Sequence, residues 1–187
     1  MERTSILLDL GCGGAVHPGS LGVDRNFHPG VALLGDLTAL PFKASTIDGC
    51  YLHHVLEHVE DVLQVLEEVW RISKPGAWID IRVPHFSCGV WAWGNPEHRR
   101  TFSSAAFRLF SGEDPTIAVR TPARFRIEEA RLCFILHDGR RMPVSRPRRV
   151  IGRVFEWLAN RHLGRCERYW AQWIGFEELY VRLQALK

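Results

Sequence analysis

A glycine-rich segment near the start of the chain has the residue types of a nucleotide-like cofactor site. The apolar run at residues 6–10 contains Asp9, and the tetrapeptide Gly11-Cys12-Gly13-Gly14 follows it directly. Glycines at the end of a strand let the backbone approach a ligand where a side chain would clash. Asp24 ends the next apolar run, where a carboxylate can accept hydrogen bonds from ribose hydroxyls.

The spacing of these residues argues against a nicotinamide dinucleotide as the ligand. The dinucleotide fingerprint places a glycine or alanine three residues after its second glycine and an acid about 20 residues further on. Here Val16 stands three residues after Gly13, and Asp24 follows Gly11 by only 13 residues. The sequence therefore favours a different cofactor.

Histidines follow the later apolar runs and are candidates for contact with a substrate. His53 and His54 end the run at residues 47–52, whereas His85 and His98 come after the run at residues 77–83. A histidine exchanges a proton near neutral pH, so His85 and His98 are the candidate general bases and catalytic residues.

A zinc hydrolase is the remote alternative for these histidines. His54, Glu57 and His58 form a His-x-x-Glu-His pattern, which is an inverted zinc-protease motif. That motif needs a helix, and this one lies at the junction of a strand and a helix, where Glu57 fits the start of the helix. The set His85, Cys88 and His98 has no evident fourth ligand. The sequence therefore predicts no metal site.

The charge of the chain is uneven. The 187 residues carry a net charge of +3, but residues 1–75 contribute −5 and residues 76–187 contribute +8. Arginines gather in residues 138–153, and the guanidinium group suits phosphate or carboxylate partners. An anionic small molecule or conjugate is the favoured substrate, and RNA is the alternative. Trp157, Tyr169, Trp170 and Trp173 have helical spacing, which favours core positions over base stacking.

Composition and cysteine use suggest the compartment. No apolar run is long enough to cross a membrane, and no charged-then-apolar leader precedes the first strand. The five cysteines are scattered and odd in number, which is typical of a reduced compartment. We therefore expect a cytoplasmic protein without a membrane span.

The order of apolar patterns predicts an α/β fold in a single domain over residues 1–187. Residues 55–70 have the three-and-four spacing of an amphipathic helix that Pro75 and Gly76 bring to an end. Strands alternating with crossover segments indicate a parallel, doubly wound sheet, and alternation at residues 178–185 indicates a half-exposed antiparallel final strand. The other expected elements are strands at 6–10, 21–24, 31–34, 47–52, 77–83 and 123–136, a loop at 87–100, a short helix capped by Ser103 or Ser104 and running to Phe110, and a helix at 147–162 with Val150, Val154, Trp157 and Leu158 on one face.

The first 76 residues resemble class I S-adenosylmethionine-dependent methyltransferases, close to the small methyltransferase type 11 family. The matching pieces occur in the family's order. They are Leu8-Asp9-Leu10-Gly11-Cys12-Gly13, Gly22-Val23-Asp24, Gly35-Asp36-Leu37-Thr38-Ala39-Leu40-Pro41-Phe42, Ile47-Asp48, His54-Val55-Leu56-Glu57-His58-Val59 and Arg71-Ile72-Ser73-Lys74-Pro75-Gly76. The segment Pro96–Ser103 also resembles a motif of a subgroup.

The resemblance implies a role for each matching position. Gly11 and Gly13 would pass under the methionine part of S-adenosylmethionine, and Asp9 would organise the turn and the methionine amino group. Asp24 would bind the ribose diol. Asp36 would accept from the adenine amino group and Leu37 would lie against the ring. His53 and His54 would face the methionine and the acceptor, and Cys12 and Arg25 complete the predicted cofactor set.

The resemblance also implies a seven-stranded sheet of order 3-2-1-4-5-7-6, with residues 1–84 as the cofactor half and residues 85–187 as the acceptor side. The chain departs from the family at the third glycine of the turn, which is Ala15, and at residues 15–20, which are too short for the usual helix. The acceptor pocket would be roofed by the segment after Pro84, by residues 138–175 or by a second subunit in a homodimer. A non-catalytic S-adenosylmethionine-binding module and an RNA methyltransferase remain the alternative functions.

Overall fold

A single seven-stranded sheet runs through the computed structural model, which describes residues 5–111, 121–135 and 145–187. The strand order is β3-β2-β1-β4-β5-β7-β6, as the resemblance implied. Pairs among β1 to β5 are parallel, and β7 is antiparallel to both β5 and β6. The strands are β1 (Leu7–Leu10), β2 (Leu21–Asp24), β3 (Val31–Leu34), β4 (Ile47–His53), β5 (Ser73–Pro84), β6 (Arg124–Cys133) and β7 (Glu178–Leu186).

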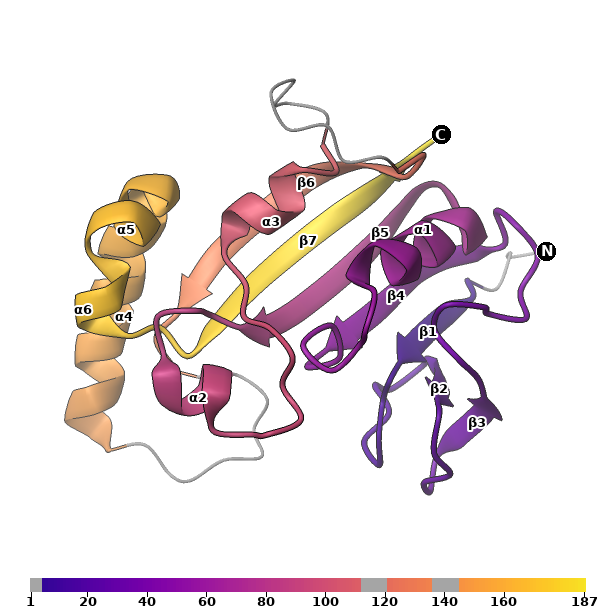
Figure 1. Cartoon of the computed structure of the whole chain (residues 1–187), viewed down its shortest axis with the longest axis horizontal. Helices are drawn as coiled ribbons and strands as arrows, with labels where there is room; N and C mark the ends of the chain where they lie inside the picture. The colour runs from indigo at the N-terminus through magenta and orange to yellow at the C-terminus, as the bar shows by residue number, and fades with distance from the viewer. Residues whose placement is uncertain (1–4, 112–120, 136–144) are drawn as a thin grey trace.

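The helices are few and unevenly placed. Helices α1 and α3 lie over one face of the sheet, whereas α4, α5 and α6 stack beside its β6 edge (Figure 1). No helix occurs between β1 and β4, so the short first crossover is a loop as expected. The helices are α1 (Val62–Ile72), α2 (Gly89–Trp93), α3 (Ser104–Arg108), α4 (Arg146–Arg161), α5 (Leu163–Tyr169) and α6 (Ala171–Ile174).

The main core lies between the sheet and the layer formed by α1 and α3. Alternate residues of the central strands, such as Leu8, Leu52 and Ile81, have no exposed surface on this face. Helix α1 buries Val65, Leu66, Val69 and Ile72 against them. The apolar side chains at every second strand position therefore pack against the apolar face of the helix, whose period is 3.6 residues, in one layer.

Four expectations about the elements are wrong. The first long helix begins after Asp61, whose carboxylate accepts from the backbone N–H of Gln64, so residues 55–58 form turns instead of a helix. Glu57 consequently does not start a helix. The segment expected to be a loop contains α2. The final strand is less exposed than its alternation suggests, because Glu178 and Tyr180 are buried.

The fourth error concerns the aromatic residues near the C-terminus. Trp157, Tyr169, Trp170 and Trp173 do not lie in the core, and Trp173 is 87% exposed. The apolar face expected for residues 147–162 also points to solvent, because the buried contacts of α4 come from Gly152 and Ala159. Helical spacing correctly predicted that the apolar residues of α4 share one face, but it did not predict that this face points to solvent.

A buried carboxylate fastens α5 to the start of α3. Glu167 Oε1 accepts from the Ser104 backbone N–H at 2.7 Å, and its Oε2 accepts from the Ser104 hydroxyl at 2.5 Å. His85 Nε2 lies 3.3 Å from Oε1. Burial would raise the pKa of Glu167, but the hydrogen bonds from His85 and Ser104 outweigh it and lower the pKa below its usual range.

The substitution Glu167→Gln should lower the unfolding free energy by about 1–3 kcal/mol at neutral pH. Because the folded-state pKa is lowered, this contribution exists above the unfolded pKa of about 4.3 and disappears as the pH falls through the folded value. Denaturant unfolding of both proteins from pH 7 to pH 3 measures the difference. The exposed Glu128→Gln is the control, and a pH-independent difference would contradict the assignment.

Candidate cofactor turn and acceptor site

The turn after β1 has the backbone conformation that the sequence required. Gly11 and Gly13 have φ values of 68° and 55°, which glycine adopts without strain. A Cβ atom on Gly11 would lie 2.7 Å from Val55, whereas nothing lies within 4 Å of a Cβ on Gly13 or Gly14. The turn is therefore tightly packed beneath Gly11 and open beside Gly13.

Asp24 at the end of β2 holds this turn. Its Oδ2 accepts from the Gly13 backbone N–H at 2.8 Å, and its Oδ1 accepts from the Asn26 backbone N–H at 2.8 Å. A carboxylate has about four acceptor positions, so each oxygen can accept one further hydrogen bond. That capacity fits a ribose diol.

Asp9 makes a contact that the sequence analysis did not predict. Its Oδ2 accepts from the His17 backbone N–H at 2.8 Å and lies 2.9 Å from His17 Nδ1. The His17 ring stacks on Tyr51 with centroids 4.1 Å apart. The loop that replaces the usual first helix is thus fixed to β1 and β4 through one histidine.

Asp36 and Leu37, which the resemblance predicts to contact adenine, follow β3. Asp36 Oδ1 accepts from the backbone N–H and the hydroxyl of Thr38 at 2.9 and 2.7 Å, and these bonds lower the pKa of Asp36. Arg25 approaches Asp36 Oδ2 to 3.8 Å across an exposed surface. Leu37 is partly buried against the core.

Cys12 and His53 complete the predicted cofactor set. Burial, followed by the charges of Asp9 and Asp24, raises the pKa of Cys12 to about 11, so this thiol stays protonated. His53 Nε2 donates to Asp80 Oδ1 at 2.7 Å, and the Tyr180 hydroxyl donates to the other oxygen at 2.8 Å. The ring of His53 is therefore held at the end of β4.

His54 belongs to a buried charge network that joins three strands. Its Nε2 lies 3.0 Å from Glu178 Oε1, and Arg82 donates to Glu178 Oε2 at 2.6 Å. Burial would lower the pKa of His54, but the carboxylates of Glu178 and Glu57 outweigh it and raise it to about 9. His54 is thus a protonated structural residue at neutral pH, and it has a positive φ of 56°.

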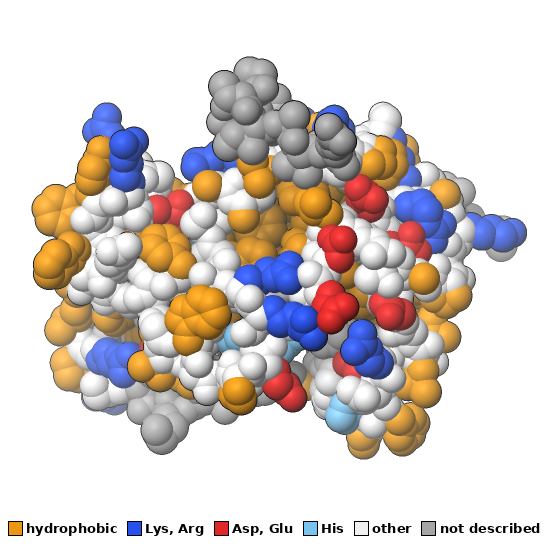
Figure 2. Space-filling view, viewed as in Figure 1, with side chains coloured by type: hydrophobic (Ala, Val, Ile, Leu, Met, Phe, Trp, Pro, Cys, Tyr) orange, Lys and Arg blue, Asp and Glu red, His pale blue; other side chains and the backbone are white. Residues whose placement is uncertain are grey.

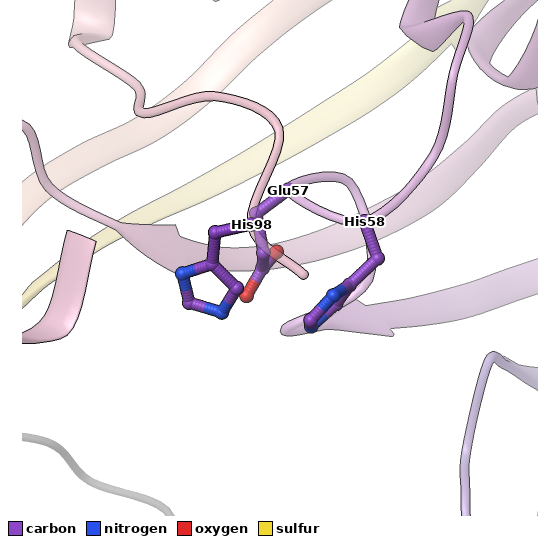
Figure 3. Close-up of side chains that lie close together, drawn as sticks. All are labelled: Glu57, His58 and His98. Atoms are coloured by element: carbon purple, nitrogen blue, oxygen red, sulfur yellow. The ribbon is translucent and has the colours of Figure 1, made fainter. Parts of the chain in front are cut away.

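The turn after His54 meets the loop that carries His98. The Arg99 backbone N–H donates to the Glu57 carbonyl oxygen at 2.8 Å. The ring centroids of His58 and His98 lie 4.7 Å apart, and the Glu57 side chain lies close to both rings (Figure 3). The structure therefore brings Glu57, His58 and His98 together, although the sequence pattern paired Glu57 and His58 with His54.

The two candidate catalytic histidines differ in access. His85 has no exposed surface, and its two ring nitrogens face Ser87 Oγ at 2.7 Å and Glu167. We assign it a structural role because no acceptor can reach it. His98 is partly exposed, and its Nδ1 donates to the Ala92 carbonyl oxygen at 3.0 Å. That hydrogen bond leaves Nε2 with its lone pair.

The comparisons with known proteins agree with this geometry. A family model described as a methyltransferase domain matches residues 8–81. Residues 8–81 are thus similar to the methyltransferase domain family. A demethylmenaquinone methyltransferase of Streptomyces avermitilis is 39% identical over 75 residues, which are 40% of this chain and 32% of that protein. The chain thus spans about a third of the length of this curated relative.

Solved structures extend the likeness to the whole fold. A methyltransferase from Archaeoglobus fulgidus that depends on S-adenosylmethionine superposes with a TM-score of 0.56 at 18% identity, over 96% of this chain and 86% of that one. A chain in the complex of the Haloferax volcanii Trm112 methyltransferase activator with a methyltransferase gives a TM-score of 0.58 at 18% identity, over 100% and 84%. The fold is that of the class I methyltransferases.

The family implies S-adenosylmethionine as the cofactor, and the turn fits it. The open space beside Gly13 and Gly14 admits a ligand against the backbone. Asp24 and Asp36 each keep acceptor capacity at successive strand ends. Cofactors of open α/β sheets bind at the carboxyl ends of the strands, where these residues lie.

The sequence analysis missed several residues that organise the site. His17 stood in a segment interpreted only as a shortened crossover, and Glu178 was assigned to a solvent-facing position. An acid that opens the terminal strand is the signal that could have identified Glu178, because a buried carboxylate needs a cationic partner.

The substitution Glu178→Gln should cost about 3–5 kcal/mol of unfolding free energy, because it removes the buried counter-charge of Arg82 and leaves protonated His54 with only the more distant Glu57. Glu129→Gln on the neighbouring strand β6 is the matched control, since Glu129 forms only an exposed contact with Arg131. Urea unfolding at neutral pH measures both variants. Equal losses of unfolding free energy in the two variants would show that the buried network stabilises the fold no more than an exposed ion pair does.

Proposed function

We propose that this protein transfers the methyl group of S-adenosylmethionine to an acceptor bound beyond the carboxyl ends of β4 and β5. The observation that carries the proposal is the ordered series of Gly11, Gly13, Asp24 and Asp36 at three successive strand ends. Residues 1–84 act as the cofactor half and residues 85–187 as the acceptor side.

The residues act mainly by binding and alignment. When bound, S-adenosylmethionine supplies a methyl group already activated by its sulfonium. Asp24 would hold the ribose hydroxyls, and the open turn at Gly13 would admit the methionine part of the cofactor. His53 is held rigidly by Asp80. His98 is the partly exposed histidine on the acceptor side. Such alignment for in-line displacement supplies most of the rate enhancement.

The acceptor we favour is an anionic small molecule or conjugate. The second half of the chain has the basic balance, and Arg148 and Arg149 at the start of α4 belong to its arginine-rich segment. Arg140 and Arg141 of that segment lie outside the described residues. The demethylmenaquinone methyltransferase relative acts, by its name, on a small molecule, which favours a small molecule over RNA but carries no argument for its charge. RNA is the second candidate, on the same charge.

The cofactor assignment predicts a specific binding defect. Asp24→Asn should abolish most of the thermal stabilisation by S-adenosylhomocysteine, because the amide places a donor where the ribose needs an acceptor. The parent protein should gain about 2.7 kcal/mol at 100 times the dissociation constant. Asp61→Asn is the control, since asparagine retains the helix cap. Stabilisation by NAD but not by S-adenosylhomocysteine would contradict the proposal.

The acceptor class predicts how labelled methyl groups distribute. Methyl transfer from labelled cofactor to cell extract should survive ribonuclease, change little with salt and fall when Arg148 and Arg149 are both replaced by alanine. Transfer to RNA would instead weaken steeply with salt, because each phosphate contact releases counterions. Label found only in neutral or cationic molecules, with the double arginine variant fully active, would exclude an anionic acceptor.

A further inference from the structure

The Glu57 carboxylate is buried without a hydrogen-bonding partner. Its side chain has no exposed surface, and neither oxygen makes a hydrogen bond. The nearest cation, His54, has its Nδ1 3.4 Å from Oε1, which is an ion-pair contact too long for a good hydrogen bond. A buried carboxylate in this state is costly unless a second cation approaches it.

The neighbours of this carboxylate are two imidazoles with the donor chemistry for a metal. The candidate ligand atoms of Glu57, His58 and His98 lie within 4.8 Å of one another. A tetrahedral ion with bonds of about 2.1 Å needs its donors about 3.4 Å apart, so small side-chain rotations would close the set. The bond from His98 Nδ1 to the Ala92 carbonyl fixes the tautomer in which Nε2 can coordinate.

We propose that Glu57, His58 and His98 bind a divalent transition metal ion such as Zn²⁺. Two imidazoles and one carboxylate suit zinc and its neighbours, and three protein ligands leave a position open for water or an acceptor oxygen. This set differs from the helical zinc-hydrolase pattern, because His98 takes the place of His54. It also departs from the expectation of no metal. His98 lies on the loop at residues 96–102. The Arg99 backbone N–H of this loop donates to the Glu57 carbonyl oxygen, which holds the loop beside Glu57.

Equilibrium dialysis of the purified full chain against zinc chloride tests the site without any measurement of activity. The parent should bind one ion per chain, and Co²⁺ in its place should give the visible absorption of a low-symmetry site. His98→Asn retains a donor toward Ala92 but loses Nε2, so its affinity should fall by at least about 100-fold. Glu57→Gln should fall similarly.

His162→Asn is the matched control, because His162 is exposed and lies outside the cluster. It should bind zinc as the parent does. Thermal unfolding without metal verifies that each variant folds. If Glu57→Gln does not fold, the zinc affinity of His98→Asn alone decides the test. Absence of stoichiometric binding by the parent, or equal binding by parent and His98→Asn, would overturn the site.

A second inference rests on a different surface, the apolar ridge of α4–α6. Hydrophobic side chains gather along this edge of the molecule, at the left of Figure 2. Each member of the ridge is at least 50% exposed: Val150, Ile151, Val154, Trp157, Leu158, Tyr169, Trp170 and Trp173. Large exposed apolar patches of this kind mark sites of interaction.

The charges beside the ridge indicate what covers it. A cleft of about 460 Å³ between α4 and β6 is lined by Arg131, Arg153 and Arg161 next to Trp157. The Nε of Arg131 makes no hydrogen bond and lies 3.6 Å from Glu129 Oε1, and Arg161 lies 5.0 Å over the Trp157 ring. Exposed tryptophan and arginine beside an apolar helix face are typical of helices that lie in the membrane interface.

We infer that the ridge docks on an anionic lipid bilayer, with lipid phosphates held by the arginines of the cleft. None of the described helices is long and apolar enough to span a bilayer, so the contact is with one leaflet. This inference does not depend on methyl transfer. If both hold, the acceptor is reached from the membrane surface.

Sedimentation with vesicles tests the docking. The full chain should bind vesicles containing phosphatidylglycerol and bind phosphatidylcholine alone far more weakly. Replacing Ile151 and Val154 by serine should abolish binding, and Arg153→Gln should weaken it about fivefold. Phe27→Ser is the control, because Phe27 is equally apolar and 78% exposed on another surface. No vesicle binding by the parent, or an unchanged partition of the Ile151 and Val154 variant, would overturn the inference, as would a dimer that buries the ridge.

Discussion

The buried charge network at the ends of β4, β5 and β7 is the constraint on which the rest of the site depends. Glu178 is fully buried and holds both protonated His54 and Arg82. It comes from the last strand, whereas His54 comes from the strand that borders the cofactor turn. The last strand therefore holds His54, more than 120 residues earlier in the chain. The turn that follows His54 brings Glu57 and His58 to the loop of His98.

The fold of residues 1–84 could be predicted from sequence to a large extent. Its strands are short apolar runs punctuated by glycine and acid, and their carboxyl ends must lie along one edge of a parallel sheet. Gly11, Gly13 and Asp24 accordingly occupy the predicted places. The strand order was implied by the resemblance and is confirmed.

The contacts of residues 85–187 could not be predicted in the same way, because they join residues far apart in the chain. The partners of His54 and His85 lie on β7 and α5, and periodicity contains no information about such pairs. The spacing on α4 showed an apolar face but not its direction. The face turned outward because Gly152 and Ala159 let the opposite side of the helix approach β6 and its neighbours. The exposed ridge is thus a consequence of small residues.

These features together describe a short version of the class I fold in which loops and side chains replace helices. His17 substitutes for the first crossover helix by linking Asp9 and Tyr51. The structure also contains the cluster of Glu57, His58 and His98 after β4 and the apolar ridge at the β6 edge of the sheet.

A crystal structure with S-adenosylhomocysteine tests the central claim most directly. The account predicts the ribose hydroxyls on the Asp24 carboxylate, the adenine beside Asp36 and Leu37, and the sulfur directed toward His53 and the His98 loop. A ligand that binds elsewhere, or one that leaves Asp24 bonded only to Gly13 and Asn26, would contradict it.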